Sequence, residues 1–224
     1  METELKLSFP SDELLSSCED ASWLLQSVRV TDRRTESYEN RYLDTKERIL
    51  HKRRTSLRVR HIVGQDYVFT VKTAPVPISG KAGEDALSGL TSRCEWNVRS
   101  EHPDFDPRAF IESAKESDDP LPILESALLP VMDEPLETVC MTEFRRRILD
   151  VQYMDSVLEI CLDTGACLAG GKRLPICEME IELICGDTNA VSSLGAIVMR
   201  HCNCSSGTLS KYARCLLLLN EEKV

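Results

Sequence analysis

The amino-acid sequence predicts a β-dominated α+β protein, built as a closed eight-stranded antiparallel β-barrel with peripheral helices. Eight segments of strand length alternate apolar and polar residues, which is the period of a strand with one buried face. Helical spacing appears only in a few segments between or after those strands, and neither an internal repeat nor a low-complexity segment interrupts the chain. We therefore expect one domain over residues 1–224.

The predicted strands follow one another along the whole chain. They cover residues 2–9, 39–45, 56–63, 66–73, 92–99, 139–150, 155–163 and 174–184. Gly64 and Gln65 join the third strand to the fourth as a short hairpin turn. The Gly-, Ser- and Ala-containing stretch 74–91 is interpreted as a loop rather than a domain linker, because similar strands resume after it. So many antiparallel strands favour closure into a barrel.

The predicted helices lie between these strands and after the last of them. Residues 11–28 show helical spacing, with Ser11 as the N-cap and with Asp12 and Glu13 in the first turn, where the helix dipole favours negative charge. Further helices are expected at residues 107–116, 121–129 and 187–201.

The composition indicates a soluble globular protein, with 42% apolar and 29% charged residues. No run approaches the ~18–20 apolar residues of a membrane span, and the N-terminus lacks the pattern of a secretory signal, so we expect a cytoplasmic protein without a membrane partner. The net charge of −10 argues against a general nucleic-acid binder. It would also repel an anionic substrate, unless cationic residues are concentrated in one place.

The ten cysteines are expected to be reduced, mostly buried thiols. Cys202 and Cys204, beside His201 in the sequence HCNC, resemble half of a zinc site. No second pair at zinc-finger spacing accompanies them, so structural thiols are the preferred interpretation.

Charged residues recur on one face of strand after strand. In the first strand Glu2, Glu4 and Lys6 share a face. The same pattern recurs at Arg58 and Arg60, at Lys72, at Arg93 and Glu95, at Glu159 and Asp163, and at Glu178, Glu180 and Glu182. One such strand is explained by a sheet with one face in water. In a closed barrel with this face inward, the charges must compensate one another or be matched by a guest.

The types of charged residue on these faces indicate which kind of ligand the barrel would bind. Arg and Lys bind phosphate oxygens, Arg through two parallel hydrogen bonds and Lys as a point charge. Carboxylates without a basic partner suit hard divalent cations such as Mg²⁺ or Mn²⁺. Both sets together predict a metal–polyphosphate site.

The segment Glu2-Thr-Glu4-Leu-Lys6 resembles the ExExK signature of CYTH domains, the triphosphate tunnel metalloenzymes. Similar segments follow in order: YLDT (42–45), LRVR (57–60), a strand ending in Lys72, RCEW (93–96), TEFRR (142–146), LEICLD (158–163), PICEMEIEL (175–183) and LSKYAR (209–214). Their order and approximate spacing match along nearly the whole chain. The later segments look most like the inorganic triphosphatase branch of the family.

The resemblance implies an eight-stranded antiparallel barrel that forms a tunnel with charged residues inside. The metal-site residues that it implies, for Mg²⁺ or Mn²⁺, are Glu2, Glu4, Asp163, Glu178 and Glu180. The triphosphate ligands that it implies are Lys6, Arg58, Arg60, Lys72, Arg146 and Lys211. The histidine-rich helical domain that some bacterial relatives append is expected to be absent.

Several assignments stay open at this point. Tyr42 with Lys72 resembles a tyrosine–lysine pair of thiamine triphosphatases, but a core or rim aromatic is as good an interpretation of Tyr42. The phase of the strand favours Arg146 inside the tunnel, yet a one-residue bulge would place Arg145 or Arg147 there.

Other in-phase charges have two interpretations, as tunnel residues or as compensating charges. These are Arg93, Glu95, Glu159 and Glu182. Because Glu2 follows Met1 directly, we also expect Glu2 to fray.

The leading hypothesis is metal-dependent hydrolysis of inorganic tripolyphosphate to pyrophosphate and phosphate. Glu4 or Glu180 would accept the proton of the attacking water, with Lys72 and Tyr42 as further catalytic candidates. The alternatives are a triphosphatase or cyclase acting on an organic triphosphate, such as thiamine triphosphate or ATP, and a non-catalytic polyphosphate-binding module. The sequence indicates no oligomeric state.

Overall fold

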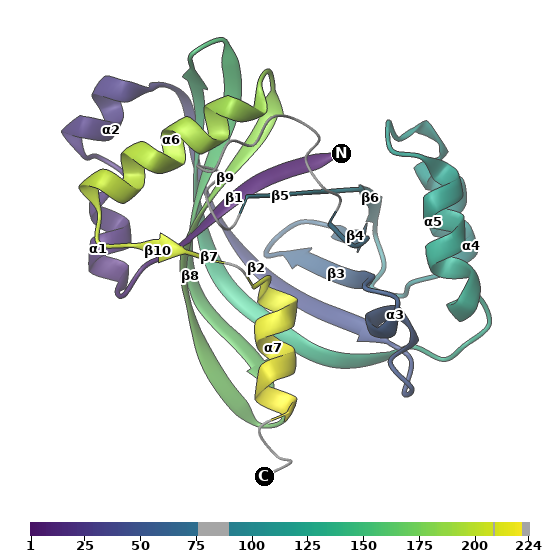
Figure 1. The fold of residues 1–224 in the computed structure, drawn as a ribbon. Coiled ribbons are helices and arrows are strands. Elements are labelled where there is room, and N and C mark those ends of the chain that lie inside the picture. Colours follow the sequence, from purple (N-terminus) through teal and green to yellow (C-terminus); the bar gives the residue numbers. More distant parts are fainter. Residues whose placement is uncertain (76–89, 208, 221–224) are drawn as a thin grey trace.

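In the computed structural model, the described residues are 1–75, 90–207 and 209–220, and most of them belong to one antiparallel sheet. The sheet curls around a central space, with most of the helices packed on its outer side and the C-terminal helix docked inside its curve (Figure 1). This architecture confirms the predicted β-dominated α+β class. The expected loop at 74–91 lies mostly outside the described residues, apart from its two ends.

The strands follow an order that differs from their order in the sequence. Their bounds are β1 Glu2–Ser8, β2 Arg29–Asp44, β3 Ser56–Ile62, β4 Tyr67–Lys72, β5 Leu90–Arg93, β6 Glu95–Ser100, β7 Glu137–Tyr153, β8 Ser156–Ala169, β9 Lys172–Cys185 and β10 Ser205–Ser206. Neighbours pair in the order β10-β1-β9-β8-β7-β2-β3-β4-β6, and β5 pairs with β1.

The two edges of the curved sheet are linked through β5 and β6, which only Cys94 separates. On one side of Cys94, Arg93 of β5 lies opposite Glu2 of β1. On the other side, Glu95 of β6 lies opposite Lys72 of β4. The segment predicted as one strand at 92–99 is therefore bent, and each half pairs with a different edge of a strongly curved half-barrel.

Several predicted boundaries were wrong. The expected helix at 11–28 is two short helices, α1 (Asp12–Ser17) and α2 (Ser22–Ser27), and Ser11 caps α1 by accepting the Leu14 N–H at 3.4 Å. Strand β2 begins ten residues earlier than the predicted start at 39, because its polar first half also pairs with β7, from Arg29 opposite Gln152 to Glu36 opposite Arg146.

The remaining helices surround the sheet. They are α3 Ile49–Lys52, α4 Pro107–Ser113, α5 Leu121–Leu128, α6 Thr188–His201 and α7 Lys211–Asn220, with 3-10 turns η1 Ala114–Glu116 and η2 Leu129–Val131. Helices α3 and α7 were not predicted. None of the helices in the described part of the chain is long and apolar enough to cross a membrane.

The outward face of the sheet is apolar and is buried beneath helices. Leu5 of β1 and Ile181 of β9 pack in one cluster with Val191 and Leu194 of α6. On the other side of the molecule, residues of β3, β4 and β6 pack beneath α4 and α5, around the fully buried Trp96. The charged face of the strands is consequently the one that points inward.

Asp44 of the YLDT segment organises the turn after β2. Its carboxylate is fully buried and accepts the backbone N–H groups of Thr45 (2.8 Å), Leu50 (2.9 Å) and His51 (2.9 Å). Because Thr45 directly follows β2 whereas Leu50 and His51 lie in α3, one side chain fixes the path of the chain between β2 and β3.

We expect Asp44→Ala to lower the free energy of unfolding by about 3 kcal/mol, because it leaves buried backbone donors without acceptors. Asp44→Asn should lose less, since its carbonyl oxygen still accepts from Thr45 and Leu50. Urea denaturation of both variants measures the difference. An Asp44→Ala midpoint equal to that of the unmodified protein would contradict this role.

Candidate functional site

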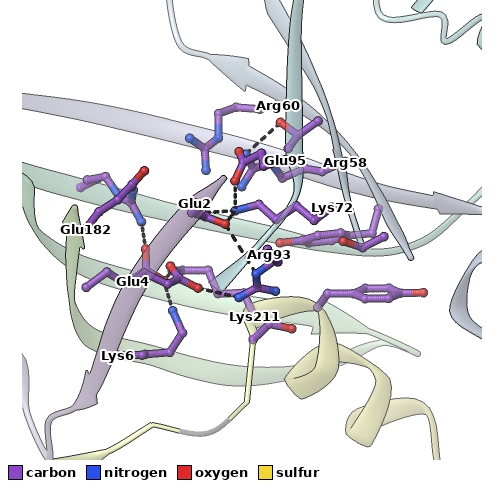
Figure 2. A pocket seen from close by; sticks show the side chains of 17 residues that line it. Glu2, Glu4, Lys6, Arg58, Arg60, Lys72, Arg93, Glu95, Glu182 and Lys211 are labelled. Carbon is purple, nitrogen blue, oxygen red and sulfur yellow. Dashed lines mark hydrogen bonds and ion pairs between the residues drawn. The ribbon is translucent and has the colours of Figure 1, made fainter. Parts of the chain in front are cut away.

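A charged cavity lies on the inward face of the sheet (Figure 2). Its charged lining residues are Glu2, Glu4, Lys6, Arg58, Arg60, Lys72, Arg93, Glu95, Arg146, Glu180, Glu182 and Lys211. The cavity volume is about 120 Å³. The space is small because acidic and basic side chains reach across it toward one another.

Strand register explains why these residues meet. Residues directly opposite each other in an antiparallel pair share a face. Lys6 of β1 lies opposite Glu180 of β9. Glu178 of β9 lies opposite Asp163 of β8, and Asp163 lies opposite Arg146 of β7. The charged faces of four strands therefore form one continuous patch.

The same register decides which arginine of the RRR segment lies inside. Arg146 is 7% exposed and donates to Asp163 at 2.7 and 2.6 Å. Arg147 points to the outer side, where it donates to Ser16 of α1 at 2.7 Å. No bulge shifts β7 at this point, so the residue that the strand phase favoured is the inner one.

A deep carboxylate cluster consists of Asp163, Glu178 and Glu180, whose oxygens lie within 4.8 Å of one another. Lys211 of α7 contacts all three, at 2.6, 2.5 and 2.9 Å. Arg146 binds Asp163 and also donates to Glu180. Asp163 and Glu178 are fully buried and lie behind the cavity wall, whereas Glu180 lines the cavity.

Two more cations complete the deep cluster. Lys6 lies 3.4 Å from Glu178 and donates to Glu180. Arg214 of α7 donates to Glu178 at 2.7 Å and to the Pro175 carbonyl. Sequence reasoning missed Arg214, because its partner is set by the docking of an unpredicted helix.

Mutual pairing keeps the deep cluster ionised. Burial alone would raise the pKa of Asp163, but Arg146 and Lys211 hold it below its ordinary value. Burial likewise opposes the charge of Glu180, yet Lys211 and Lys6 hold its pKa well below the usual range. The pKa of Lys211, which burial would lower, is held well above its ordinary value by these carboxylates.

A second cluster lies at the start of β1. Lys72 donates to Glu2 at 2.7 Å and lies 2.6 Å from Glu95. Arg93 donates to Glu4 at 2.7 Å, and its Nε lies 3.5 Å from Glu2. The expectation that Glu2 frays was wrong, because two cations and a strand pairing hold it in place.

The carboxyl groups of the second cluster differ in their pKa values. Burial raises the pKa of Glu2 to about 8 against the opposing effect of Lys72. Burial also raises the pKa of Glu182 to about 7, and no cation lies within ion-pair distance of it in the described residues. For Glu4, burial is outweighed by Lys6 and other cations, so its pKa is lowered.

Two arginines of β3 lack an acidic partner. Arg58 donates to the Thr70 hydroxyl at 2.9 Å, and its Nε is buried without a hydrogen-bond partner. Arg60 donates to Asn40 at 3.0 Å and lies 4.0 Å from the centre of the Tyr38 ring. Among the described residues neither has a carboxylate oxygen within 4 Å. Burial and the neighbouring Arg58 lower the pKa of Arg60 to about 10.

Tyr42 lies in the cavity wall and stacks on Tyr212 of α7 with ring centroids 5.0 Å apart. Burial raises the pKa of its hydroxyl. Lys72 lines the same cavity, but no hydrogen bond joins Tyr42 to Lys72 among the described residues.

Two further sequence expectations can be placed. Glu159 is a compensating charge, since it pairs with Arg34, which also donates to Asp150 at 2.6 Å. The HCNC segment forms no cluster of metal ligands in the described part of the chain. Instead, the Cys202 sulfur lies 3.3 Å from the Cys18 sulfur.

Comparison with known sequences identifies relatives of this chain. The family model described as CYTH domain matches residues 1–215. An inorganic triphosphatase from Haemophilus influenzae is 30% identical over 151 residues, which are 66% of this chain and 36% of that protein. The chain therefore spans little more than a third of the length of this curated relative.

Solved structures share the fold at low sequence identity. A putative adenylyl cyclase from Hippeastrum, described as having a dominant triphosphatase activity, has a TM-score of 0.64 at 18% identity, over 100% of this chain and 97% of that chain. A protein from Pyrococcus horikoshii OT3 has a TM-score of 0.54 at 17% identity, over 99% of each chain. The fold, the order of its motifs and a family model that matches residues 1–215 agree: the chain belongs to the CYTH domain family.

Proposed function

We propose that this protein hydrolyses inorganic tripolyphosphate to pyrophosphate and phosphate with the help of a divalent metal ion. The observation that carries the proposal is the pair Arg58 and Arg60, partly buried cations that line the cavity without an acidic partner among the described residues. A buried charge is costly unless it is paired. An anion with several oxygens along its length supplies that pairing, and phosphate oxygens match the geometry of guanidinium groups.

The donor set in the same cavity fits a hard divalent cation. Glu2, Glu4, Glu180 and Glu182 supply carboxylate oxygens, which Mg²⁺ and Mn²⁺ prefer. When bound, such an ion lowers the pKa of a coordinated water and offsets charge on the phosphates. Asp163 and Glu178 belong to the proposed metal set too, but their use requires Lys211 and Arg146 to turn toward the substrate.

The proposed substrate ligands surround the space on several sides. They are Lys6, Arg58, Arg60, Lys72, Arg146 and Lys211. Glu4 and Glu180 both have lowered pKa values, so both are ionised and able to accept a proton from the attacking water. Burial would lower the pKa of Lys72, but Glu95 and Glu2 raise it, so Lys72 acts as a cation and hydrogen-bond donor. The Tyr42 hydroxyl keeps its proton and is a donor as well.

A second candidate substrate is an organic triphosphate, because a second chamber adjoins the charged cavity. Its volume is about 260 Å³, and it shares Ser56, Lys72, Arg93, Ser210 and Tyr212 with the cavity. Its other walls include His51, Pro75, Leu209 and Ala213. The charged groups of its described lining are cationic, with no carboxylate among them, which favours a neutral head group such as adenosine over the cationic thiamine.

Arg58→Ala and Arg60→Ala should each weaken tripolyphosphate binding by about tenfold to a hundredfold, since charge-assisted hydrogen bonds contribute ~1.5–3 kcal/mol each. The unliganded variants should be more stable, because each loses one of two neighbouring, partly buried like charges. Calorimetric titration and thermal melts measure both effects, with the exposed Arg173→Ala as the matched control. Unchanged binding in both variants would mean that these arginines do not face the substrate.

Glu4→Gln should abolish metal-dependent phosphate release and leave the fold intact, because the amide keeps the shape of the side chain but lacks its charge. Phosphate release from tripolyphosphate with Mg²⁺ or Mn²⁺ is the measurement, and a circular-dichroism melt checks the fold. Turnover at the unmodified rate would reject Glu4 as a metal ligand. Tripolyphosphate binding without release in the unmodified protein would favour a non-catalytic polyphosphate-binding module.

Ala213→Phe, which fills the second chamber, distinguishes the two substrates. If an organic triphosphate is used, kcat/KM for ATP should fall at least about tenfold, while kcat/KM for tripolyphosphate stays unchanged. Leu217→Phe, on an exposed part of the same helix, is the matched control. Equal values for ATP in both variants, or no turnover of ATP by the unmodified protein, leave tripolyphosphate as the substrate.

A further inference from the structure

The cations of the cavity fall into two kinds according to their partners. Arg58 and Arg60 contact only neutral acceptors in the described structure. Lys6, Lys72 and Arg93 are instead paired with glutamates of the proposed metal set. A cation that pairs with a metal-binding carboxylate competes with the metal for that carboxylate. The presence of these glutamate-paired cations therefore requires a separate explanation.

Arg93 bridges both glutamates of the ExExK segment (Figure 2). Its Nη2 donates to Glu4 at 2.7 Å, and its Nε lies 3.5 Å from Glu2. Strand pairing enforces this position, because Arg93 of β5 lies directly opposite Glu2 of β1. The guanidinium therefore lies between the two carboxylates that are proposed to bind the metal.

The fit of Arg93 is incomplete, which distinguishes it from a permanent structural pair. Its Nε is buried and has no hydrogen-bond partner among the described residues. Arg146, by contrast, donates two full hydrogen bonds to Asp163, at 2.7 and 2.6 Å. A buried donor without an acceptor is unfavourable, so Arg93 is the more readily displaced of the two.

We propose that Arg93 is an internal counter-ion that holds Glu2 and Glu4 until a divalent metal displaces it, and that the displaced guanidinium then binds the triphosphate. This inference rests on the proposed role of Glu2 and Glu4 as metal ligands. Arg93 lines the charged cavity and the adjoining chamber, so it reaches an anion without moving out of the site.

The proposal couples the two binding events. A metal ion that binds alone must displace Arg93, so its affinity is reduced. An anion that draws Arg93 away from Glu2 and Glu4 removes this competition and raises metal affinity, and by linkage the metal raises anion affinity by the same factor. The side chain thus favours simultaneous binding of metal and triphosphate.

The test is the affinity for Mn²⁺ alone, measured by calorimetry without any phosphate. Arg93→Met keeps a long side chain but removes the charge, and it should bind Mn²⁺ about tenfold more tightly than the unmodified protein. Arg58→Met is the matched control, because it also removes one cavity charge but frees no carboxylate. It should bind Mn²⁺ within about twofold of the unmodified protein, while both variants bind metal-free tripolyphosphate more weakly.

Equal Mn²⁺ affinity in Arg93→Met and Arg58→Met overturns the proposal. Arg93→Lys, which keeps a cation at this position, replaces Arg93→Met if the latter does not fold. It should bind Mn²⁺ no more tightly than the unmodified protein, and tighter binding would also overturn the proposal. Glu4→Gln separates this inference from the proposed function: Mn²⁺ binding that it leaves unchanged rejects Glu4 as a ligand, whatever Arg93 does.

Discussion

The rest of the structure depends on the requirement that a charge buried inside a protein be compensated. Asp163, Glu178 and Glu180 meet this requirement within the chain, because four cations from β1, β7 and α7 surround them. Helix α7 supplies two of those cations, Lys211 and Arg214. Its docking inside the curve of the sheet is therefore part of the same charge arrangement that forms the site.

An inward charged face also determines what covers the outside of the sheet. Side chains alternate between the two faces of each strand. The charged residues point inward, so the mostly apolar residues between them point outward and must be buried beneath other elements. Helices α1, α2 and α6 cover them on one side, and α4 and α5 on the other. A register slip of one residue would exchange the two faces and leave both charges and apolar side chains in the wrong surroundings. The fold and the site are consequently fixed by one register.

Features that depend only on the alternation of side chains along a strand could be predicted from the sequence. Features that depend on tertiary contacts could not. Glu2, Glu4 and Lys6 were assigned to one face because strand alternation requires it, and the β-rich fold and the CYTH family were confirmed. The choice of Arg146 over its neighbours needed the observed register of β7 with β8. Arg214 was missed because its contact with Glu178 depends on how α7 docks, which no local pattern encodes.

The buried charges of the cavity are compensated unevenly. In the deep cluster every carboxylate pairs with several cations, so its charges are compensated before any ligand enters. Glu182 and the pair Arg58 and Arg60 have no opposite charge within ion-pair distance among the described residues, and they line the open part of the cavity. Acidic and basic groups left in this state in one cavity are compatible with the proposed ligand, which carries both signs of charge. A divalent metal bound to a chain of phosphates has that composition, whereas phosphate alone would satisfy the arginines and repel Glu182.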